Sequence, residues 1–184
     1  MKLEELRQLT DEQLVERFPF IKNRNRFTNE ECEGVEIDRN DSWYDLELLI
    51  CERIKQSYDN WDEKTKKDFM ILDIKEKYGS LRFYVSFEDD NISRAISDAE
   101  NLSFCICSNC GNLEKDESGK NAITYKERVF GGTIALCKTC AEKFQKYYNY
   151  KFEKVLEPFE YKITRFSSEG NKTTTYNSLE LFNV

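Results

Sequence analysis

Two C-x-x-C pairs constrain this chain more than any other feature of its sequence. The pairs are separated by residues 111–136 and consist of Cys107 with Cys110 and Cys137 with Cys140. In a C-x-x-C turn both thiolates can point at one ion while backbone N–H groups donate to the sulfurs. Gly111 follows the first pair directly and permits the positive φ that such a turn often requires. Four sulfurs suit tetrahedral zinc, so the spacing predicts that these cysteines bind one Zn²⁺ ion.

The predicted zinc is structural, because a catalytic zinc keeps one coordination position open for water and four thiolates leave none. The second pair leads directly into the helical pattern "AEKFQKYYNYKF". A turn with two ligands followed by a helix start with two more indicates a treble-clef or zinc-ribbon module over residues 105–150, which should unfold when the metal is removed. A redox role for either pair is the alternative, but no thioredoxin-like βαβ pattern surrounds them.

The three remaining cysteines are expected to be buried thiols. Cys105 is two residues from the first pair, and C-x-C spacing is less suited to sharing an ion, so it is expected to pack beside the site without binding the metal. Neither Cys32 nor Cys51 has an activating base nearby in the sequence. An odd number of cysteines, four of them in C-x-x-C pairs, favours metal binding in a reducing cytoplasm over a disulfide framework.

Hydrophobic periodicity predicts an α+β fold in which helices pack on a small antiparallel sheet or hairpin. The expected helices cover residues 42–61 and 91–104, on either side of a hairpin over residues 68–87. The tail contains two further candidate strands, at residues 159–166 and 173–181. We expect one continuous domain built from a helical N-terminal part with the central hairpin, the four-cysteine module and a C-terminal β extension, which are residues 1–104, 105–150 and 151–184.

The hairpin separates an apolar face from a charged one. Gly79 is expected at the turn, with Tyr78, Leu81 and Phe83 in the core. Charged groups beside an aromatic ring suit a carboxylate, a phosphate or an acidic protein surface. The predicted partner-binding face is therefore the basic patch flanked by a tyrosine, made of Lys75, Lys77, Arg82 and Tyr84. An ordinary solvated strand face is the alternative.

The chain contains no histidine, which removes His-dependent nucleophile activation and His-based metal hydrolases. We therefore predict that the protein is not an enzyme. The best remaining catalytic pattern is Asp73 with Lys75, since both would share a strand face and resemble half of a Mg²⁺-dependent nuclease site. Alternating charge on a solvated strand explains the same pattern.

Composition weighs against membranes and, less strongly, against nucleic acid. Residues 1–14 are acidic and amphipathic, unlike a signal peptide, and the sequence has no apolar run of the ~20 residues that span a bilayer. The net charge is −7, whereas nucleic-acid binders usually present a basic face. A nucleic-acid-binding zinc protein remains the main alternative, with Lys75, Lys77, Arg82 and the lysine-rich residues 138–154 as contacts.

Several of these segments together resemble an uncharacterised family of zinc-binding proteins from bacteriophages and bacterial mobile elements. The family pattern is an I-K-E-K-[YF]-G-x-L-R-[FW]-Y core followed by a helix and paired cysteines. Here the matching segments are "FPFIKNRNRF" (18–27), "DSWYDLELLICERI" (41–54), "DIKEKYGSLRFY" (73–84), "AENLSFCICSNCG" (99–111) and "ALCKTC" (135–140). The family commonly has Gly-Trp where this chain has Ser42-Trp43, and the tail after Lys143 is unmatched.

The resemblance implies a setting in a bacterial host cell and no reaction. Combined with a structural metal and an acidic surface, it leads to the hypothesis of a small phage-type accessory protein. Such a protein would bind a host protein in the cytoplasm and inhibit a host or anti-phage defence system. The nucleic-acid-binding protein and the nuclease built on Asp73 and Lys75 are the two alternatives.

Overall fold

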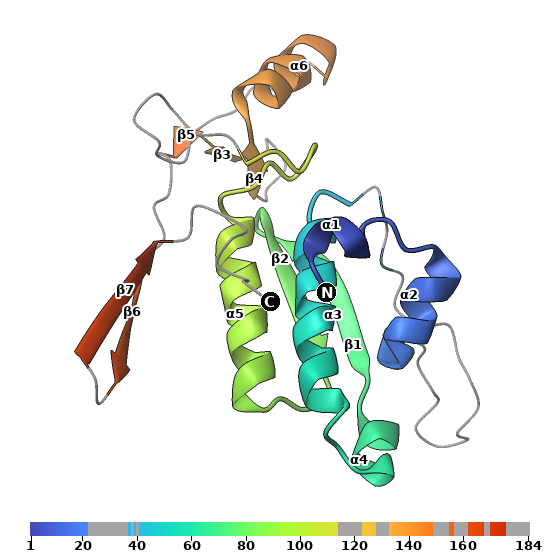
Figure 1. Cartoon of the computed structure of the whole chain (residues 1–184). Helices are drawn as coiled ribbons and strands as arrows, with labels where there is room; N and C mark the ends of the chain where they lie inside the picture. Colours follow the sequence, from blue (N-terminus) through green and yellow to red (C-terminus); the bar gives the residue numbers. More distant parts are fainter. Residues whose placement is uncertain are drawn as a thin grey trace.

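The computed structural model describes residues 1–21, 37, 39, 41–113, 123–127, 133–148, 155–156, 162–167 and 170–175. Helices and antiparallel strands together form the predicted α+β fold (Figure 1). The N-terminal part contains α1 (Leu3–Leu6), α2 (Asp11–Arg17), the 3₁₀ helix η1 (Pro19–Ile21), α3 (Tyr44–Tyr58), α4 (Glu63–Asp68), β1 (Ile71–Lys77), β2 (Ser80–Val85) and α5 (Asp90–Ser103). The later elements are β3 (Thr124–Glu127), β4 (Thr133–Leu136), α6 (Lys138–Tyr148), β5 (Val155–Leu156), β6 (Lys162–Ser167) and β7 (Gly170–Thr175).

Local capping chemistry sets where the helices begin. Thr10 accepts a hydrogen bond from the backbone N–H of Gln13, whose side chain accepts in return from the Thr10 N–H, as a capping box requires. Asp89 caps α5 in a simpler way, by accepting from the N–H of Ile92 at 2.8 Å. These caps satisfy backbone donors that have no partner within the helix.

α3 and α5 lie side by side against the β1–β2 hairpin (Figure 1). α5 also protects the outer edge of β2, because its side chains accept hydrogen bonds from amides that β1 cannot reach. The Leu81 N–H donates to Ser103 Oγ at 2.9 Å, and the Phe83 N–H donates to Glu100 Oε1 at 3.1 Å. A covered edge cannot pair with another strand, so α5 ends the central sheet at β2.

The hairpin turns through only two residues, Tyr78 and Gly79, and both have positive φ, at 55° and 79°. Positive φ at both central residues defines a type I′ turn, the geometry that matches the twist of two antiparallel strands. The prediction that Tyr78 belongs to the core is wrong, because 65% of this residue is exposed. A two-residue turn places its first central side chain at the tip, beyond the apolar face.

The main core lies between α3, α5 and the inner face of the hairpin. Leu81 and Phe83 are buried there as predicted, together with the apolar positions of the two helices. A separate small core contains three of the four paired cysteines and is built from Cys107, Ile123, Ile134, Ala135, Leu136, Cys137, Cys140 and Ala141. The C-terminal strands do not extend the central sheet: β5 pairs with β3, and β6 pairs with β7 in a sheet of their own.

Among the described residues, no helix combines the length and the apolar character needed to cross a bilayer.

Candidate metal centre

The first cysteine pair lies in a tight turn that follows α5. The Cys107 N–H donates to the Asn112 carbonyl at 2.9 Å, and the Gly111 N–H donates to the Cys107 carbonyl at the same distance. Gly111 has a φ of 69°, a left-handed conformation that glycine adopts without penalty. The glycine predicted to complete this turn therefore does so.

The second pair is positioned by the junction of a strand and a helix. Cys137 follows β4 directly, and Cys140 lies in the first turn of α6, where its backbone N–H donates to Cys137 Sγ at 3.4 Å. The turn that contains Cys107 and Cys110 is attached to β4 by Ser108, whose N–H and Oγ both donate to the Ala135 carbonyl at 2.8 Å. These two hydrogen bonds hold the pairs against each other.

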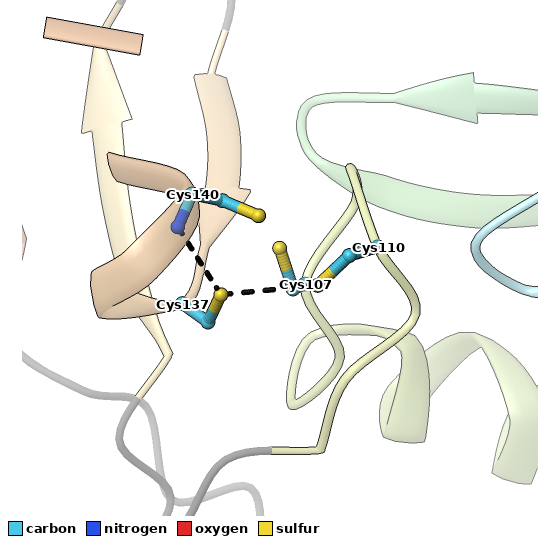
Figure 2. Close-up of side chains that lie close together, drawn as sticks. All are labelled: Cys107, Cys110, Cys137 and Cys140. Atoms are coloured by element: carbon cyan, nitrogen blue, oxygen red, sulfur yellow. Dashed lines mark hydrogen bonds between the residues drawn. The ribbon is translucent and has the colours of Figure 1, made fainter. Parts of the chain in front are cut away.

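All four sulfurs face a common space between the turn and the start of α6 (Figure 2). The sulfur atoms of Cys107, Cys110, Cys137 and Cys140 lie within 4.8 Å of one another. The Sγ atoms of Cys110 and Cys137 are 3.8 Å apart, and a tetrahedral ion with Zn–S bonds of about 2.3 Å would separate two sulfurs by about 3.8 Å. The four thiols therefore match the size and number of ligands of a structural zinc site.

The environment of the thiols favours a bound cation. Burial and the neighbouring thiols raise the pKa of Cys110 far above its ordinary value, and burial raises the pKa of Cys137 to about 11. For Cys140, hydrogen bonds outweigh burial and lower the pKa, and one of them comes from Asn109 Nδ2 to its Sγ at 3.3 Å. Crowded thiolates repel one another, so a divalent cation would stabilise the ionised cluster.

The order of elements is that of a treble clef: a two-cysteine turn, the β3–β4 hairpin and a helix whose first turn carries Cys140. In this module three of the cysteines are buried and only Cys110 is exposed. Four protein sulfurs complete a tetrahedral set, so the arrangement is suited to holding chain segments together rather than to activating water.

The other described cysteines are buried outside this cluster. Cys105 packs in the main core, and burial raises its pKa to about 11. Cys51 is likewise buried in α3, with its pKa raised well above the ordinary value by burial and by Glu47 and Glu52. Burial therefore disfavours ionisation of both thiols, and neither belongs to the four-cysteine cluster. Cys32 lies outside the described residues.

The predicted partner face is assembled on the outer side of the β1–β2 hairpin. Lys75 pairs with Arg82 across the strands, and Asp73 pairs with Tyr84, so these side chains share one face with Lys77. The Lys75 ammonium lies 5.0 Å from the centre of the Tyr84 ring. The face is less basic than its lysines suggest, because Lys75 pairs with Asp73 and Arg82 lies 3.5 Å from Glu100.

The nuclease pattern has a defined place in this face. Asp73 and Lys75 form an ion pair in which both side chains are nearly half exposed. Among the described residues, the four cysteines form the only group of three or more potential metal ligands. The arrangement at Asp73 is that of a solvated strand face, and the nuclease remains a prediction.

The sequence did not predict the roles of two residues: Asn109 beside the cysteine cluster and Leu72 in the β1–β2 hairpin. Asn109, which donates to Cys140 Sγ, occupies a variable position of the C-x-x-C motif, where spacing carries no information about it. Leu72 is 54% exposed because a register shift between Ile71 and Asp73 interrupts the alternation of faces along β1. In the sequence, only the break in apolar–polar alternation within "MILDIK" could have indicated that Leu72 is exposed.

Comparison of the chain with models of protein families, with curated proteins and with solved structures finds no match.

Proposed function

We propose that this chain is a non-enzymatic accessory protein that binds a protein of a bacterial host through the outer face and tip of its β1–β2 hairpin. In this proposal a Zn²⁺ ion held by the four cysteines stabilises the treble-clef module and takes no part in chemistry. Inhibition of a host or anti-phage defence protein is the biological role that we propose, and the family resemblance contributes to it only the setting in a bacterial host cell.

One observation supports the protein-binding role above all others. Among the described residues, three of the four large hydrophobic side chains that are exposed lie in the hairpin: Leu72, Tyr78 and Tyr84. The fourth, Phe87, lies two residues beyond the hairpin and packs on Trp61 and Phe69. Exposed aromatic side chains mixed with lysine and arginine are the composition of protein-binding hot spots, which bury rings and leave charged groups at the rim.

The charge of this face indicates the kind of partner. Lys75, Lys77 and Arg82 outnumber Asp73 on the outer face of an otherwise acidic protein. The ion pair between Lys75 and Asp73 is exposed and therefore weak, so a partner carboxylate can compete for the lysine. A host protein with an acidic patch around an apolar centre would match this surface.

Affinity purification of the tagged chain from a bacterial host, followed by affinity measurement with the purified partner, tests the proposal. We expect a stoichiometric partner whose binding weakens at least about tenfold in Tyr84→Ala and in Lys77→Glu. Lys64→Glu is the matched control, because Lys64 is an exposed lysine of α4, away from the hairpin face. No stoichiometric partner under several conditions, or equal effects of Lys77→Glu and Lys64→Glu, would contradict it.

A further inference from the structure

A cavity of about 410 Å³ lies between η1, the last turn of α3 and α4. Its volume falls within the roughly 300–1,000 Å³ of small-molecule sites. The described residues around it belong to neither the cysteine cluster nor the outer face of the hairpin.

The floor of the cavity is aromatic and closely packed. Phe20 and Phe69 are both buried, and their ring centres lie 5.8 Å apart in an edge-to-face arrangement at 86°. The Tyr58 ring lies 5.3 Å from Phe20 and is partly exposed. Packed rings of this kind offer an apolar surface on which a planar group can stack or sit edge-on.

The rim of the cavity carries two lysines and one carboxylate. Lys66 is held over the Tyr58 ring, with its Nζ 5.7 Å from the ring centre, and it contacts Glu63 at 3.0 Å. The Lys66 side chain is 23% exposed, whereas that of Glu63 is 91% exposed. An ion pair with so exposed a carboxylate is weak, so Glu63 is a replaceable partner for Lys66. Lys67 adds a second positive charge at the same rim.

We infer that this cavity binds a small aromatic carboxylate. The ring of the ligand lies on Tyr58, behind which Phe20 and Phe69 are packed, while its carboxylate takes the place of Glu63 beside Lys66 and also contacts Lys67. A cationic ligand is disfavoured by the two lysines, and the cavity volume is sufficient for one or two fused rings. This site is separate from the proposed protein-binding face, so either proposal can fail without the other.

Binding can be followed with 2-naphthoate as the probe and uncharged 2-naphthalenemethanol as the comparison. The chain has two tryptophans. Trp61 lies 5.0 Å from Phe69 and 5.8 Å from Tyr58, measured between ring centres, whereas Trp43 is buried in the main core. In ¹H–¹⁵N NMR spectra of the zinc-loaded chain we expect a saturable shift of the Trp61 indole signal with naphthoate, a stationary Trp43 signal and clearly weaker binding of the alcohol.

Variants of α4 then separate charge recognition from general hydrophobic binding. Lys66→Gln and Lys67→Gln should each weaken naphthoate binding by about five- to tenfold, because each removes a charge-assisted contact. Glu63→Gln should tighten binding, since it removes the competing carboxylate. Lys64→Gln, on the same helix but outside the cavity, should leave the affinity unchanged. An absence of saturable shifts, equal binding of acid and alcohol, or equal effects of Lys64→Gln and Lys67→Gln would overturn the inference.

Discussion

The carbonyl oxygen of Ser42 lies 2.9 Å from the position that a β-carbon on Gly111 would occupy. Ser42 also donates from its Oγ to the Ser108 carbonyl at 2.6 Å. These contacts join the segment that precedes α3 to the first cysteine turn, although the two are far apart in the sequence. The metal centre is thereby attached to the main core, and stability of the turn should be linked to stability of the helical part.

Gly111→Ala should destabilise the protein by about 1–3 kcal/mol, because alanine combines a strained positive φ with a clash against a backbone oxygen. Urea denaturation of zinc-loaded protein measures this change. Ser42→Ala serves as the comparison, since it removes only the Oγ hydrogen bond and should cost about 1 kcal/mol. Equal stability of Gly111→Ala and wild type would refute the close approach of the two segments.

Replacement of any one ligand cysteine by serine should abolish stoichiometric zinc binding and unfold the treble-clef module. Elemental analysis of purified protein should find one zinc per wild-type chain. Cys105→Ser is the matched control: it lies next to the first turn, but its thiol belongs to the main core, so zinc should be retained. Loss of zinc in Cys105→Ser to the same extent would show that the ligand set is wrong.

The ion pair of the buried Glu52 with the partly exposed Arg17 should contribute strongly to stability. Arg17 Nε donates to Glu52 Oε2 at 2.9 Å, and only 6% of the Glu52 side chain is exposed. Arg17→Ala leaves a buried carboxylate with fewer partners, so we expect a loss of about 3 kcal/mol in denaturation experiments. The exposed pair of Arg7 and Asp45 provides the control, because Arg7→Ala should cost at most about 1 kcal/mol. Similar losses in both variants would contradict this ranking.

The buried carboxyl group of Glu52 and the partly buried one of Glu100 should influence acid stability in opposite directions. Burial opposes ionisation of Glu52, but Arg17 and the N-terminal ammonium outweigh it and lower its pKa. Its stabilisation is therefore full above the ordinary pKa of about 4.5 and is lost as the pH falls through the lower folded value. Burial raises the pKa of Glu100, against the effect of the Phe83 N–H, so acid relieves a penalty there.

These signs can be tested by measuring the free energy of unfolding between about pH 6 and about pH 3, the range around ordinary carboxyl pKa values. Glu52→Gln should make the decline of stability with acid shallower, and Glu100→Gln should make it steeper. Both variants keep the four cysteines, so the contribution of the metal site to the pH dependence of stability is the same in both and cancels in the comparison. The same slope change in both variants would contradict the assignment.

Tyr78→Asn should stabilise the hairpin while weakening partner binding. Asn-Gly is the preferred sequence for a type I′ turn, and relief of the strained tyrosine should add about 0.5–1 kcal/mol of stability. Loss of the exposed ring should at the same time lower the affinity for the host partner. Thermal denaturation and affinity measurement on the same preparations check both effects, and unchanged affinity would remove Tyr78 from the proposed binding face.

Spacing and periodicity were sufficient to predict the four cysteines that lie together, the α3 and α5 helices and the turn at Gly79. These features depend on neighbours within a few residues: the reach of two thiolates in one turn, the 3.6-residue period of an amphipathic helix and the φ that glycine allows. The same local rules failed for Tyr78, because the length of the turn, rather than its apolar character, decides which side of the sheet a residue reaches.

Contacts between remote segments were decided only by the tertiary structure. Ser42 lies against Gly111, and Phe20, Tyr58 and Lys66 line one cavity. Nothing in the sequence positions of these residues predicts that they lie together. Such contacts arise because burying the apolar faces of α3, α5 and the hairpin brings their flanking loops together. Chemistry that resides in one short motif could therefore be predicted from the sequence, whereas surfaces and cavities shared by several segments required the fold.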